Sequence, residues 1–252
     1  MRLRLLCALA TTFLCGALAA SDLTITFASK GKGPMGTGGN STEVQYMTSG
    51  YQMIRNAEAQ RDDLVDFKQG VSYNIDHKKK VISKISFDDA MSALEAVNNS
   101  QSQGLGKLMG GLFGDPNDVK VEQAGTEKVA GRDCQIWHIK VGKLLMDLSA
   151  DPTLKPPMPE GEYARMMQVR AAQFAKAGPM GATYKRLYEE MAKIKGVPLK
   201  THMSGFMGVD NTREATKVDT GAVPAATFAL PEGYKVEDMG KQLKEQMAKA
   251  GN

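Results

Sequence analysis

Cysteine and histidine are scarce in this chain, and their scarcity excludes several kinds of site. The sequence contains three cysteines, Cys7, Cys15 and Cys134, and three histidines. Cys7 and Cys15 fall in an N-terminal segment that we expect to be removed, which leaves Cys134 without an intramolecular disulfide partner. We therefore expect the fold to be stabilised by a hydrophobic core of ordinary size rather than by disulfides.

Catalytic and zinc-binding motifs are also lacking. His77, His138 and His202 do not have the i, i+4 spacing of a zinc helix, and none neighbours a cysteine pair. Cys134 would share a strand face with His138, but the rise of a strand separates such residues by about 13 Å, too far for a nucleophilic pair. No Gly-x-Ser-x-Gly motif occurs. The sequence thus predicts no enzyme, no catalytic residue and no cofactor.

Soft ligands for copper occur at one place, around His202, Met203 and Met207. If this segment is a strand, alternation places Met203 and Met207 on one face and His202 on the other. A single metal ion would need its ligands on one face. We therefore predict no metal site.

An excess of positive charge, which nucleic-acid binding requires, is missing as well. The formal net charge is +4, and loss of Arg2 and Arg4 would leave 30 basic against 28 acidic residues, a net charge of +2. Such a balance excludes an electrostatic nucleic-acid surface. No run after residue 20 is apolar enough to span a bilayer, so the mature chain is predicted to have no membrane span.

Residues 1–20 have the three parts of a secretory signal peptide. Arg2 and Arg4 are followed by an apolar run over 5–14 and by small residues at 17–19. We expect cleavage after Ala19 or Ala20 and a mature protein in the periplasm or outside the cell. Two alternatives stay open: a retained anchor helix, and a lipoprotein modified at Cys15, which the absence of a small residue before Cys15 disfavours.

The rest of the chain divides into one domain over 21–236 and a polar C-terminal helix or tail over 237–252. Alternation with period two predicts a meander of short strands, the pattern of an antiparallel sheet. No internal repeat is evident. The predicted strands are 23–27, 42–48, 51–56, 63–67, 71–75, 80–86, 119–123, 128–130, 134–141, 144–149, 197–209 and 212–220, with turns at 125–127, 142–143 and 210–211, a loop over 31–39, and 231–234 ending the sheet.

Helical spacing predicts four helices, at 87–98, 160–177, 182–195 and 236–250. Ser86, with Asp89 three residues later, resembles the capping box that begins a helix. Between the first two helices, glycines recur among apolar residues. We expect this stretch, 104–114, to be either a mobile lid or a disordered connector, with the lid residues Leu105, Leu108, Met109, Leu112 and Phe113.

Four stretches together carry a resemblance to a known family. They are the hairpin 71–80 running into 85–89, the segment Val129-Ala130-Gly131-Arg132-Asp133-Cys134 before Trp137, the segment 196–201, and the run Phe228-Ala229-Leu230-Pro231-Glu232-Gly233-Tyr234. The chain resembles a bacterial family of exported proteins defined as a domain of unknown function. That family is similar in architecture to periplasmic lipoprotein carriers of the Lol type. The resemblance implies an α+β fold: a curved antiparallel sheet, an incomplete β-barrel, wrapped over helices.

These observations favour an exported, non-enzymatic protein that binds a lipid, a lipidated peptide or another apolar ligand in a half-barrel cavity. Burial of acyl surface would drive binding, at about 25 cal/mol per Å². The alternative is a structural or protein-interaction module of the cell envelope with a self-filled core. The sequence does not predict the oligomeric state. The residues expected to line the cavity are Phe27, Tyr73, Ile85, Trp137, Met203 and Met207.

Overall fold

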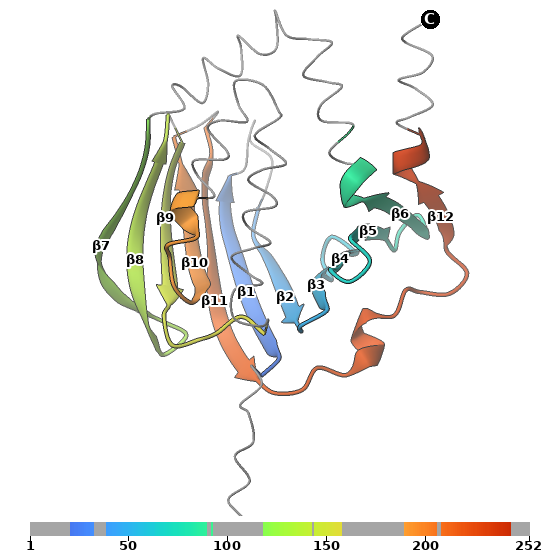
Figure 1. Cartoon of the computed structure of the whole chain (residues 1–252), viewed down its shortest axis with the longest axis horizontal. Coiled ribbons are helices and arrows are strands. Elements are labelled where there is room, and N and C mark those ends of the chain that lie inside the picture. The colour runs from blue at the N-terminus through green and yellow to red at the C-terminus, as the bar shows by residue number, and fades with distance from the viewer. Residues whose placement is uncertain are drawn as a thin grey trace, which may run out of the picture.

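Alternating apolar and polar residues form most of the described chain into strands of one sheet. The structure is a computed structural model and describes residues 21–32, 39–89, 92, 118–142, 144–157, 189–205 and 208–242. In this part of the chain twelve strands pair in the order β12-β6-β5-β4-β3-β2-β1-β11-β10-β9-β8-β7. The sheet curves between its two edges, β12 and β7, without closing into a barrel (Figure 1). The bounds are β1 Leu23–Lys32, β2 Ser41–Met47, β3 Tyr51–Asn56, β4 Arg61–Asp66, β5 Val71–Asp76, β6 Val81–Ser86, β7 Val119–Val129, β8 Arg132–Val141, β9 Leu144–Asp151, β10 Val197–Ser204, β11 Asp210–Thr220 and β12 Lys235–Asp238.

The strands β3 to β6 repeat one hairpin geometry every ten residues. At the end of three successive strands, an Asn or Asp Oδ1 atom accepts a hydrogen bond from the backbone N–H three residues later. These bonds are Ala59 N–H to Asn56 at 2.8 Å, Gln69 N–H to Asp66 at 2.9 Å and Lys79 N–H to Asp76 at 2.9 Å. Each turn then closes with a left-handed residue: Gln60 at φ 54°, Gly70 at φ 64° and Lys80 at φ 55°. Three successive hairpins therefore share one turn geometry, although no internal repeat is evident in the sequence.

The other half of the sheet is less regular, because bulges interrupt its ladders. The register shifts between Gln123 and Gly125 in β7 and between Pro198 and Lys200 in β10. A bulge inserts an extra residue and increases the local twist of the strand. Residues 125–127, predicted to be a turn, instead continue β7 past its bulge, while the hairpin at 142–143 is confirmed by β8 and β9.

A second predicted turn, at 210–211, is also wrong. Asp210 and Asn211 begin β11 and pair with Lys32 and Gly31 of β1. A Cβ atom at Gly31 would lie 2.1 Å from the carbonyl oxygen of Asp210, so only glycine permits this pairing. The strand β1 consequently extends into the segment predicted to be a loop.

The C-terminal segment crosses the sheet before it joins an edge. The 3₁₀ helix η2, Ala225–Phe228, lies below β3–β5 on the convex side of the sheet (Figure 1). β12 then pairs in parallel with β6, so the sheet does not end at 231–234 as predicted. Strand β12 also takes the first residues of the predicted helix 236–250, of which 239–242 are helical.

The remaining helix predictions fall largely outside the described residues. Residues 87–89 are helical, and the Asp89 N–H donates to Ser86 Oγ at 3.0 Å, which confirms the predicted cap. Residues 189–191 are helical, before Gly196. None of the helices in this described part is long and apolar enough to cross a membrane.

The core is divided between the two faces of the sheet. We call the face that carries Leu23, Ile25 and Phe27 of β1 the inner face and the opposite face the outer face. These three side chains are at most 2% exposed and form one cluster with residues of β10 and β11. A second cluster covers β8 and β9 and contacts Met191 and Ile194. The third lies on the outer face, where Met53 and Leu64 pack against Phe228 of η2.

Candidate functional site

The inner face brings together four of the side chains predicted to line a cavity. Pairing across the strands places Phe27, Ile85, Trp137 and Met203 on this face. Tyr73 pairs with Leu64, which pairs with Met53, and so it lies on the outer face. Tyr73 is therefore not part of the same surface, because neighbouring residues of a strand point to opposite faces. Met207 and the five residues of the predicted lid lie outside the described residues.

Polar side chains also lie on this face, and two of them are Arg213 and Trp137. The Arg213 guanidinium lies 3.4 Å from the centre of the Phe27 ring, and its Nε atom is 3.0 Å from Glu43 Oε2. Burial lowers the pKa of Arg213, although Glu43 opposes this shift. The indole Nε1 of Trp137 is buried, and no acceptor among the described residues bonds to it. The cation is thus neutralised by a carboxylate of the protein, whereas the indole N–H has no partner in the described part of the chain.

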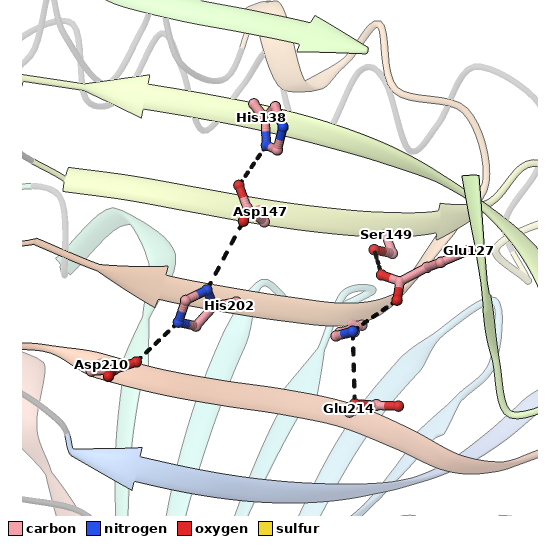
Figure 2. Close-up of polar contacts among 8 residues, drawn as sticks. Glu127, His138, Asp147, Ser149, His202, Asp210 and Glu214 are labelled. Atoms are coloured by element: carbon pink, nitrogen blue, oxygen red, sulfur yellow. Dashed lines mark hydrogen bonds and ion pairs between the residues drawn. The ribbon is translucent and has the colours of Figure 1, made fainter. Parts of the chain in front are cut away.

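Alternating histidine and aspartate side chains form a row across the outer face of β8–β11 (Figure 2). The Nδ1 atom of His138 is 2.6 Å from Asp147, and Asp147 is 4.0 Å from His202. His202 in turn contacts Asp210 at 3.0 Å. Each side chain in this row comes from a different strand, so the register of the sheet aligns them.

A second row on the same face centres on Glu127, which accepts hydrogen bonds from Ser149 and, at 2.8 Å, from Lys200 Nζ (Figure 2). Burial tends to raise the pKa of Glu127, but the bonds from Lys200 and Ser149 outweigh burial and lower it. The Glu127 hydrogen bond, in turn, raises the pKa of Lys200. Lys200 also lies 4.0 Å from Glu214, so one lysine contacts two carboxylates in this row. No group of ligands suited to a metal ion occurs among the described residues.

The histidines are more engaged than the sequence indicated. His77 has Nε2 at 3.2 Å from Asp62 and Nδ1 at 3.0 Å from the Tyr234 hydroxyl. His138 and His202 meet through Asp147, a connection that no spacing along one strand reveals. As predicted, Met203 pairs on the opposite face from His202, so the two do not converge.

Cys134 is not placed to act as a nucleophile. Its side chain is 1% exposed, and its thiol donates to the Arg132 carbonyl at 3.7 Å. Burial, with the nearby Asp151, raises the pKa of the thiol to about 11. Because the thiolate is the reactive form, this environment suppresses reactivity near neutral pH.

A groove of about 470 Å³ opens on the outer face of β3–β5. One side is formed by these strands and the other by the segment 223–230 that carries η2. Its lining is mostly apolar and aromatic, and sequence reasoning missed it because the two sides are distant in the chain. The residues around it are Thr48, Tyr51, Leu64, Asp66, Gln69, Tyr73, Val223, Ala225, Phe228, Ala229 and Leu230.

Residues 68–234 match the model of a protein family described as a domain of unknown function, DUF4412. This match covers more than half of the 252 residues and confirms the resemblance to an uncharacterised family. No curated protein matches the sequence.

Solved structures show a distant likeness. PNGF-II is 13% identical with a TM-score of 0.44, over 92% of this chain and 33% of that one. The MucA/MucB complex of Pseudomonas aeruginosa gives 12% identity and a TM-score of 0.43, over 87% of this chain and 59% of that one. A putative outer membrane lipoprotein-sorting protein domain from Vibrio parahaemolyticus is 10% identical with a TM-score of 0.26, over 82% of this chain and 89% of that one. The chain thus spans about a third of PNGF-II and less than two thirds of the second structure.

Proposed function

Because the chain belongs to DUF4412, a family defined as a domain of unknown function, we propose a function from its residues: it binds an apolar or amphipathic ligand along the inner face of its sheet. The ligand is a lipid or a lipidated peptide. The proposal includes export through the signal peptide at 1–20, cleavage after Ala19 or Ala20, a periplasmic location, a single domain over 21–236, helices over the concave face and a non-enzymatic role.

One observation carries the proposal: the two faces of β8–β11 differ in chemistry. On the inner face, Trp137 and Met203 continue the apolar surface of β1, and neither is fully buried. On the outer face, the neighbouring residues His138 and His202 belong to a row of polar side chains that contact Asp147 and Asp210. An open sheet with one apolar face offers an acyl chain a surface that removes it from water.

The test is recovery of a bound ligand. The processed protein, purified from the cell envelope, should release lipid on solvent extraction and show a ligand mass by native mass spectrometry. It should also bind a fluorescent acyl probe. Recovery of no lipid together with no probe binding would reject the proposal.

A pair of neighbouring substitutions assigns the binding to the inner face. Met203→Lys places a charge on the apolar side, and we expect it to weaken acyl-probe binding about tenfold or more, because a charge in an apolar site is costly. His202→Lys makes the same addition on the outer face, between Asp147 and Asp210, and should leave binding unchanged. Equal effects of the two variants would contradict an inner-face site.

One observation favours a second candidate, an envelope interaction module with a self-filled core. Leu23, Ile25 and Phe27 are already at most 2% exposed, so the inner face at β1 is covered by the protein itself. If this covering extends along the whole face, the protein should enrich a stable partner from envelope extract and bind no acyl probe. Absence of such a partner would reject this candidate.

A further inference from the structure

The groove on the outer face of β3–β5 contains a carboxylate that the fold itself does not neutralise. Asp66 is 4% exposed and lines the groove. Its Oδ1 atom accepts the Gln69 N–H, but no lysine, arginine or histidine of the described chain forms an ion pair with it. Lys68 of the same turn packs over Gly50 and does not line the groove. Burial of an unpaired charge is costly, so this carboxylate needs a physical explanation.

The ten-residue repeat shows that turn formation does not explain the charge. Asn56 makes the same turn bond one repeat earlier with a neutral side chain, at 2.8 Å. Asp76, one repeat later, is charged but has Arg61 and Lys79 at 3.8 and 3.9 Å. Of these three turn residues, Asp66 is the one whose side chain is a buried carboxylate with no cation of the described chain in contact with it. An asparagine would satisfy the turn equally well, so the charge is available for another purpose.

Aromatic rings surround this carboxylate. Tyr51 pairs directly with Asp66 across β3 and β4, and its ring stacks on Phe228 with centroids 5.2 Å apart. Tyr73 joins the lining from β5. The faces of aromatic rings carry negative charge density and attract cations, above all alkylated ammonium groups. Among the described residues that line the groove, Asp66 is the charged one, so the charge of the lining is negative.

The wall that carries Phe228 is fixed in place. The Arg55 Nη2 atom donates to the Thr227 carbonyl at 2.9 Å, and the Val223 N–H donates to Asp22 Oδ2 at 3.0 Å. The guanidinium of Arg55 also lies 5.7 Å from the centre of the Tyr46 ring. A wall held at both ends loses little conformational freedom when a ligand binds, which favours affinity.

We propose that this groove binds a small soluble methylated ammonium compound. The Asp66 carboxylate balances the charge of the ammonium group, and the rings of Tyr51, Tyr73 and Phe228 contact its methyl groups. The site lies on the opposite face of the sheet from the proposed acyl-binding surface and does not depend on it.

The experiment titrates choline and tetramethylammonium into the processed protein by isothermal calorimetry, with dimethylbutanol, the neutral carbon isostere of choline, as the matched ligand control. We expect saturable binding of both cations and at least about tenfold weaker binding of the neutral compound, because it lacks the charge that the carboxylate and rings attract. Equal affinity for choline and dimethylbutanol would overturn the proposal.

Two variants locate the binding. Asp66→Asn keeps the turn acceptor and removes the charge, and it should weaken choline binding about tenfold or more. Asp63→Asn makes the same change on the same strand but on the opposite face, where Asp63 accepts from Asn74 at 2.7 Å, and should leave affinity within about twofold.

Phe228→Leu keeps the groove apolar and removes one ring, with an expected loss of about fivefold. Thermal unfolding monitors the integrity of each variant. If Asp66→Asn fails to fold, the ring variant and the ligand pair still decide the outcome. Unchanged affinity in Asp66→Asn, or binding to phosphatidylcholine vesicles without binding to soluble choline, would overturn the proposal.

Discussion

The meander β3–β6 and the half-sheet β7–β11 belong to one sheet but differ in the lengths of their strands and in the regularity of their pairing. In the meander, each strand has six residues. Each turn has the same hydrogen bond from a backbone N–H to a side chain and a left-handed backbone conformation at the same position. In the other half, strands of 8 to 11 residues pair through bulges. The meander buries its outer face under η2, whereas β8 and β9 bury their inner face.

This difference shows that the hydrophobic core lies on one face of the sheet in one half and on the other face in the other half. β1 and β2 lie where the change occurs: Leu23 and Ile25 point to the inner face, while Tyr46 joins the cluster on the outer face. Each half therefore has its own core, on opposite faces of the sheet. The acyl-binding surface and the groove are proposed on the faces that carry these two cores, and for this reason they lie on opposite sides of the sheet.

The largest expected effect comes from removing an aromatic ring from each core. Phe27→Ala empties a site that is 2% exposed and leaves Arg213 without its ring, so we expect a loss of about 3–5 kcal/mol in the free energy of unfolding. Phe228→Ala, at the open groove, should lose less, about 2–3 kcal/mol, because solvent reaches the space that it leaves. Urea unfolding measures both. A greater loss of unfolding free energy for Phe228→Ala than for Phe27→Ala would show that the outer-face core contributes more to stability than the inner-face core.

A smaller expected effect is the contribution of the Asp151 carboxylate to the free energy of unfolding, which depends on pH. Burial opposes ionisation of Asp151, but hydrogen bonds from Thr153 and Arg132 outweigh it and lower the pKa of the carboxyl group. A lowered folded-state pKa stabilises the protein above the unfolded value of about 4, and this contribution is lost as the pH falls through the folded value. Asp151→Asn should cost about 2–3 kcal/mol near neutral pH.

The control for this prediction is pH itself. The stability difference between Asp151→Asn and the unchanged protein should shrink as urea unfolding is repeated at progressively lower pH, because the folded protein loses the carboxylate once the pH falls through its lowered pKa. A difference that stays constant with pH would show that the charge of Asp151 contributes nothing.

The smallest expected effect tests the repeat. Gln60 and Lys80 adopt the left-handed conformation that Gly70 adopts without strain. Lys80→Gly should therefore stabilise the protein by up to about 1 kcal/mol, and Gly70→Ala should destabilise it by about the same amount. Thermal unfolding measures these shifts. Changes of the same sign in both variants would show that the three turns are not equivalent.

Local patterns predicted what depends on local physics. The hairpins between 51 and 86, the turn at Gly142 and the Ser86 cap follow from neighbouring residues and are confirmed. The predicted turn at 210–211 failed because β1 offers Asp210 and Asn211 a partner nearly 180 residues earlier in the chain. A glycine in a strand is equally compatible with a turn and with a bulge, which explains the error at Gly125.

Long-range pairing also explains what the sequence did not reveal about the sites. The row from His138 to Asp210 exists only because the register of four strands aligns its members. Tyr73 was grouped with Phe27 because both are aromatic strand residues, yet only the pairing through β2–β5 shows that they face opposite ways. The groove requires a segment that crosses back over the meander, and no periodicity within that segment indicates such a path.

The position of β1 has a consequence for the order in which the protein can be completed during synthesis. Its partner β2 follows directly, but its other partner, β11, emerges only after every strand from β2 to β10, and β12 comes later still to cover β6. Until then the growing chain has unpaired edges at β1 and β10, which await β11, and at β6, which awaits β12. Such edges invite association with other chains, and the long separation between β1 and β11 slows their pairing. The release of β11 and β12 from the ribosome or translocation channel thus controls when both halves become one sheet, and a holding chaperone would have these edges to protect until that moment.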